Sequence, residues 1–147
     1  MEHYFEIITQ TRANFIKLID GLSIEQINHI PEGFNNNIIW NFAHAISAQQ
    51  VLCYKLSSLP PVVDQNFISM FMKGTKPEQF IDEEKVAHIK KLAIVTVEKL
   101  KVDLADKVFT NYTPYTTSYN VSLSSIDDAI RFAIRAAHIH KARISHM

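Results

Sequence analysis

The chain has 147 residues, a length that suits one domain spanning residues 1–147 with a sizeable hydrophobic core. Lysine plus arginine number 15 and aspartate plus glutamate number 15, so no excess positive charge favours nucleic acid or an anionic membrane as partner. Its apolar runs are shorter than the roughly 18 residues that a membrane span needs. Cys53 is the only cysteine, and the chain does not open with a signal-peptide pattern. We therefore expect a cytoplasmic protein.

The first half of the chain has the spacing of two helices. Apolar side chains recur at alternating steps of four and three residues up to Leu22, which predicts an amphipathic helix that ends near Gly21. This stripe consists of Tyr4, Ile8, Thr11, Phe15, Leu18 and Leu22. Ser23 and Gln26 have the spacing of a capping box and predict a short extra turn. A second helix, apolar nearly all round and therefore buried, is predicted from Asn36 or Asn37 to Leu56.

The second half predicts two further helices and two long connections. The roughly 20 residues that follow Leu56 are predicted to form a loop that covers the bundle, because this connection is much longer than the usual link between two helices. Asp82 can cap a third helix that ends near Ala105, with a seam of Val86, Ile89, Ala93, Thr96 and Leu100. Residues 108–121 predict an extended crossing or a weak hairpin, because Pro114 interrupts a stretch rich in threonine and tyrosine. Ser124 or Ser125 can cap the last helix, with the seam Ile126, Ile130, Ala133, Ala137, His140 and Ile144.

These elements predict an all-α protein, a four-helix bundle with long connections between helices 2 and 3 and between helices 3 and 4. Bundles of this kind build metal and cofactor sites from side chains that point inward from facing helices. Two histidines, His44 and His140, fall on the inward faces of the second and the last helix. A buried imidazole needs partners for both ring nitrogens, and an ordinary hydrogen bond would serve as well as a metal. The side chains of the other histidines are predicted to be exposed to solvent.

Several stretches resemble the DinB-like (YfiT-like) superfamily of metal-dependent enzymes. The segment Asn35-Asn36-Asn37-Ile38-Ile39-Trp40-Asn41-Phe42-Ala43-His44 resembles the family's second-helix signature. The ending Leu-Ser-Ser-Leu-Pro-Pro of residues 56–61 is similar to members of the family. His140-Lys141-Ala142-Arg143-Ile144 is similar to its final histidine followed by x-Gly-x-Ile, with alanine in place of the glycine.

The resemblance implies a metal site made by three histidines, one from the second helix and two, spaced by four, from the last. His44 matches the first position and His140 the last, whereas the middle position is Ala136, which cannot coordinate a metal. Two imidazoles hold a divalent ion less firmly than the three protein ligands typical of catalytic zinc. The sequence therefore predicts an incomplete metal site.

Three hypotheses follow from this pattern. In the first, His44 and His140 hold zinc or nickel, with water or another side chain such as Asn41 completing the shell, and any activity resembles that of metal-dependent hydrolases or of transferases and isomerases that use low-molecular-weight thiols. In the second, the bundle binds a small apolar or thiol-containing ligand without metal, and Trp40 and Tyr54 are the candidate ligand-lining residues. In the third, the bundle associates with itself as a homodimer.

Other chemistry is less well supported. Cys53 lies within an apolar helix, where a thiol is usually inert. Asp127 and Asp128 are better explained as negative charges at the start of the last helix than as a catalytic pair. No serine has the sequence context of an activated nucleophile, and catalytic residues cannot be assigned.

Overall fold

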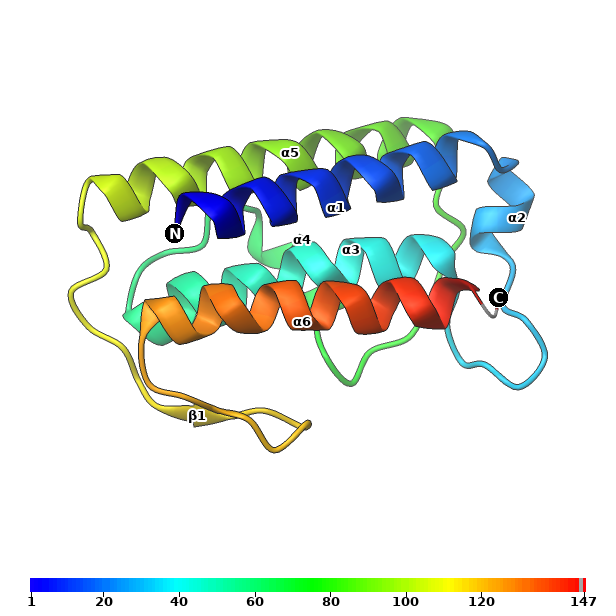
Figure 1. Ribbon diagram of the computed structural model, residues 1–147. Helices are drawn as coiled ribbons and strands as arrows, with labels where there is room; N and C mark the ends of the chain where they lie inside the picture. Colours follow the sequence, from blue (N-terminus) through cyan, green and yellow to red (C-terminus); the bar gives the residue numbers. More distant parts are fainter. Residues whose placement is uncertain (146) are drawn as a thin grey trace.

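The computed structural model describes the backbone of residues 1–145 and 147 and the side chains of residues 1–136, 144 and 147. Helices dominate this part of the chain, and a single two-stranded antiparallel sheet accompanies them (Figure 1). In chain order the elements are α1 (Glu2–Asp20), α2 (Ile24–Asn28), α3 (Ile38–Gln49), η1 (Gln50–Tyr54), η2 (Lys55–Ser57), α4 (Gln65–Phe71), α5 (Glu83–Ala105), β1 (Tyr115–Thr116), β2 (Ser122–Leu123) and α6 (Ile126–Ser145). The fold is all-α, as the sequence predicts.

Side-chain caps set where most helices begin. Ser23 and Gln26 form the predicted capping box at the start of α2, each side chain bonding the backbone N–H of the other. Asn37 caps α3 by accepting a hydrogen bond from the Trp40 N–H at 2.9 Å. Asp82 caps α5 in the same way. The predicted starts of these elements are therefore confirmed.

The second predicted helix is continuous but changes its winding. It is α-helical up to Gln49, becomes a π-helix over Gln50–Tyr54 and closes as a 3-10 turn over Lys55–Ser57. Ser58 then adopts a left-handed conformation with φ of 60° and ends the helix. A π-turn inserts one extra residue in a turn and is frequent at functional sites.

The long connection after η2 contains a helix that the sequence did not predict. Asp64 caps α4 by accepting from the Asn66 N–H, and the buried residues Ile68 and Phe71 pack it against α3. The helix is only 7 residues long, too short for its apolar period to stand out from a covering loop. The predicted hairpin is present as the short pair β1 and β2, in which Tyr115 faces Leu123.

Helices α1, α3, α5 and α6 pack together as a bundle with α4 alongside α3 (Figure 1). α3, continued by η1, runs antiparallel to α6 (Figure 1): Ile38 and Ile144 line one groove at one end of the bundle, and Cys53 of η1 and Ala129 line a small cavity toward the other. In the described part of the chain, no helix is long and apolar enough to cross a membrane.

The buried face of α1 differs from the predicted stripe. The residues that α1 buries are Phe5, Ile8, Arg12, Phe15 and Ile19. Leu18, which the stripe placed inside, is 42% exposed. The buried face of the helix is shifted toward positions one residue later, because Phe5 and Ile19 pack into the core and Arg12 donates three hydrogen bonds there. The predicted seam of α5 is buried in full.

Candidate metal centre and ligand groove

His44 is held in a defined orientation on α3. Its Nδ1 lies 2.7 Å from the carbonyl oxygen of Phe71 at the end of α4. Its ring stacks on the indole of Trp40, one turn earlier, with centroids 4.7 Å apart and planes at 7°. The Trp40 indole is itself held by a hydrogen bond from Nε1 to the hydroxyl of Thr75. The Phe71 carbonyl at the end of α4 and the Trp40 indole on α3 together fix the plane of the His44 imidazole.

The contact with Phe71 determines which nitrogen of His44 carries the proton. A carbonyl oxygen only accepts, so Nδ1 is the donor and Nε2 keeps its lone pair in the neutral ring. Burial lowers the pKa of His44 below its ordinary value, with the Phe71 hydrogen bond opposing part of that shift. A neutral imidazole whose single N–H donates to a backbone carbonyl is the usual state of a metal-ligating histidine.

The backbone places position 140 close to the level of His44 along the bundle. Ile38 and Ile144 line the same groove, and His44 lies six residues after Ile38, roughly 9 Å along the helix axis. His140 lies four residues before Ile144, or roughly 6 Å along α6. The side chain of His140 lies outside the described residues, as does that of Ala142, so the predicted convergence of the two imidazoles stays a prediction.

Along the bundle axis, Ala136 lies on the opposite side of His44 from position 140. It is eight residues before Ile144, roughly 12 Å along the axis, so positions 136 and 140 straddle the height of His44. The side chain of Ala136 lines a small cavity of about 50 Å³ together with Arg12, Gln49 and Cys53. A guanidinium has no lone pair to offer a metal, and its charge repels a cation. Neither Ala136 nor its cavity therefore supplies a third ligand.

The described side chains fit only part of the metal site that the family implies. Among residues 1–136, 144 and 147, no three His, Cys, Asp or Glu side chains gather as a metal cluster would require. Asn41 is buried one turn before His44, and its amide nitrogen donates to Asn36 Oδ1 at 3.0 Å and to the Asn37 carbonyl at 2.8 Å. Because the amide nitrogen is used in these bonds, only the amide oxygen of Asn41 could serve as a ligand. The described residues thus offer His44 and an amide oxygen, and a two-histidine metal site stays a prediction.

Trp40 and Tyr54, the candidate ligand-lining residues, lie far apart on α3 and its extension. Trp40 contacts the imidazole of His44. Tyr54 is 14 residues further along, where its hydroxyl donates to Asp103 Oδ2 at 2.5 Å and its ring meets Phe109 edge-on. Burial raises the pKa of Tyr54, and the hydrogen bond to Asp103 adds to the shift. The structure does not bring the two aromatic rings together, and their role as ligand-lining residues stays a prediction.

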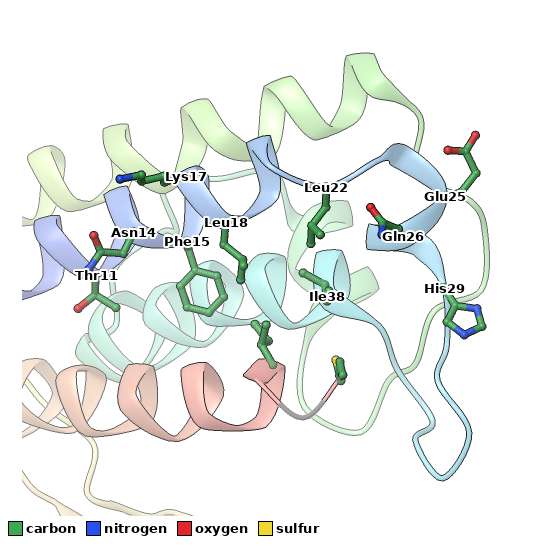
Figure 2. A pocket seen from close by; sticks show the side chains of 12 residues that line it. Thr11, Asn14, Phe15, Lys17, Leu18, Leu22, Glu25, Gln26, His29 and Ile38 are labelled. Carbon is green, nitrogen blue, oxygen red and sulfur yellow. The ribbon is translucent and has the colours of Figure 1, made fainter.

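A groove of about 940 Å³ opens at the end of the bundle where Ile38 and Ile144 meet. Figure 2 shows Phe15, Leu18 and Leu22 pointing from α1 and the following turn toward α6, whereas Glu25 points outward. Met147 closes one side. Pockets of this size with an apolar lining and a polar rim are typical of small-molecule sites.

Sequence reasoning missed Arg12, the most unusual residue of the core. Its side chain is 7% exposed, and burial lowers its pKa to about 10. The available signal was its position, four residues after Ile8 and three before Phe15 on the helical stripe. A charged residue at such a position usually lies at the edge of the apolar face. The apolar pattern therefore predicts that Thr11, and not Arg12, belongs to the buried stripe.

The fold is an all-α bundle that holds His44, one of the predicted metal ligands, in a defined orientation. The family model of the DinB superfamily matches residues 7–143, which is nearly the whole chain. The chain therefore belongs to the DinB superfamily. No curated protein matches it at a significant level of similarity.

Proposed function

We propose that the protein is a metal-binding member of the DinB superfamily with a reduced, two-histidine centre. His44 and His140 would hold a divalent ion, zinc or nickel, and water or Asn41 would complete its shell. The observation that supports this most is the Nδ1 bond of His44 to Phe71, which fixes the orientation of the ring and places the lone pair of the neutral imidazole on Nε2. Positions 136 and 140 lie on either side of His44 along the bundle axis, which also supports the proposal.

A two-histidine centre leaves open positions for an exogenous ligand. A bound divalent ion lowers the pKa of a coordinated thiol or water and so generates a nucleophile at neutral pH. A low-molecular-weight thiol is the substrate class that we propose, and transfer, isomerisation or hydrolysis is the reaction class. Affinity for the ion should be weaker than in a three-ligand site, because Ala136 adds no donor and Arg12 adds a nearby positive charge.

Equilibrium dialysis of untagged protein against zinc and nickel tests the metal proposal. Wild type should bind about one ion per chain, and His44→Gln should remove the binding. His88→Gln is the matched control, because His88 is exposed on α5 and should leave binding unchanged. Binding that is absent in wild type, or equal in wild type and His44→Gln, would refute the proposal.

The groove supports a second candidate function, the binding of a small apolar ligand without metal. Its lining combines leucine, isoleucine and phenylalanine with a rim of Lys17, Glu25 and His29. A thermal-shift screen in the presence of a chelator tests this function. Leu18→Lys should abolish the shift by a ligand, whereas Val102→Lys, a matched change at an exposed valine of α5, should not. Shifts that depend on added metal, or that Leu18→Lys leaves intact, would contradict it. Self-association stays a prediction.

A further inference from the structure

Arg12 is a buried cation that no carboxylate of this chain neutralises. Its guanidinium donates three hydrogen bonds, from Nη1 to the Ala93 carbonyl and the Thr96 hydroxyl, and from Nη2 to Gln49 Oε1. All three acceptors are neutral. Every Asp and Glu of the sequence precedes residue 129 and is described, and none forms an ion pair with Arg12. Arginine is rarely this buried without a negative partner.

The guanidinium also has donors to spare. An arginine carries five N–H groups, and the three bonds use both groups of Nη1 and one of Nη2. The N–H of Nε and the second N–H of Nη2 make no hydrogen bond to the described residues. The neighbouring Gln49 is held in the same network, because its Oε1 accepts from Arg12 and its Nε2 donates to the Thr96 carbonyl.

The cavity beside Arg12 has room for a small ion, and Arg12 is the charged side chain in an otherwise largely apolar lining. It measures about 50 Å³, enough for a halide or a carboxylate group but far below the roughly 300 Å³ of a typical small-molecule pocket. Alanines from α3 and α6, Ala136 among them, form much of its wall and leave the space open. Cys53 also lines it and offers a weak S–H donor, and burial raises the pKa of its thiol to about 12, so it stays neutral.

We propose that the cavity between α1, α3 and α6 is a binding site for a small monovalent anion, a halide or a small carboxylate, held by Arg12. The anion neutralises the guanidinium and accepts its two remaining N–H groups. Among the described residues that line the cavity, none is a ligand of the proposed metal centre, so the anion site goes beyond the proposed function and its test in a chelator is independent of the metal.

Thermal unfolding of the full chain in a chelator tests the site. Sodium chloride and sodium formate should raise the melting temperature saturably relative to sodium gluconate, whose anion is too large, at equal ionic strength. At tenfold excess over the dissociation constant the rise should be about 3 °C or more. Ala136→Leu, which fills the cavity and keeps Arg12, should remove the difference between the anions. Arg135→Met, at an exposed arginine of α6, should retain it.

Two results would overturn the site. The first is a wild-type protein that melts alike in chloride, formate and gluconate. The second is an Ala136→Leu variant that responds to chloride as the wild type does. Crystals soaked in bromide provide a readout that needs no variant: an anomalous peak within hydrogen-bond distance of Arg12 is expected, and its absence at saturating bromide would count equally against the proposal.

Discussion

His44 and Phe71 are joined by a hydrogen bond of 2.7 Å between the imidazole Nδ1 and a backbone carbonyl. The bond links α3 to the end of α4, a helix that lies within the long connection after η2. The short helix therefore does more than cover the core, because its last carbonyl selects the tautomer of the histidine on which the proposed centre depends.

His44 should remain neutral to lower pH than an exposed histidine. Burial lowers its pKa, so the unfolded chain, with a histidine pKa of about 6.5, binds the proton more readily than the folded one. The free energy of unfolding should therefore fall as pH drops below about 6.5 and stop falling below the folded pKa. Urea titrations at several pH values would measure this.

His44→Gln is the comparison for the pH dependence, since the exposed histidines contribute to both proteins alike. The difference between wild type and variant should shrink toward acid pH. A difference that is constant between pH 7 and pH 5 would contradict a depressed pKa at His44.

Ala136→His should strengthen metal binding. Positions 136 and 140 lie on one face of α6 and straddle His44, so a histidine at 136 completes the three-histidine set that the family resemblance implies. Zinc affinity should rise at least about tenfold, or about 1.4 kcal/mol. Competition with a chromogenic chelator would measure the gain, and Arg135→His, one residue away on the exposed side, should show none.

The sequence predicted the helices more reliably than the site. The caps at Ser23, Asn37 and Asp82 are local features, and a few residues suffice to specify them. The hydrogen bond between His44 and Phe71 joins residues 27 apart in sequence, and nothing in either segment indicates it. The helical register of Arg12 can be read from the sequence, but the partners that allow its burial cannot. Its acceptors come from α3 and α5, and only the packed bundle brings them together.

Cys53 should be inert in the folded protein. It is fully buried, and burial raises the pKa of its thiol to about 12, so the nucleophilic thiolate is scarce at pH 8. Ellman's reagent should react with less than one thiol per chain in native buffer and with one thiol in denaturant. Rapid reaction of the native protein would show that Cys53 is accessible and that the cavity beside Arg12 opens to solvent.

Tyr54→Phe should destabilise the bundle. The hydroxyl of Tyr54 and the amine of Lys99 share the carboxylate of Asp103, which is 6% exposed. Loss of the hydroxyl leaves one carboxylate oxygen without its buried donor and should cost about 1–3 kcal/mol in denaturant titrations. Tyr119→Phe removes a hydroxyl from a residue that is 52% exposed, and it should cost much less. Equal losses in the two variants would mean that the bond to Asp103 contributes nothing.

The most direct test of the central claim is X-ray absorption at the zinc edge of untagged protein loaded with one equivalent of zinc. A two-histidine centre predicts two imidazole nitrogens at roughly 2.0–2.1 Å, with oxygen in the remaining positions. Ala136→His should raise the number of imidazoles to three, and His44→Gln, which should not retain the ion, should leave oxygen scatterers alone. A wild-type spectrum with oxygen scatterers alone, or one that His44→Gln leaves unchanged, would contradict a metal centre built on His44.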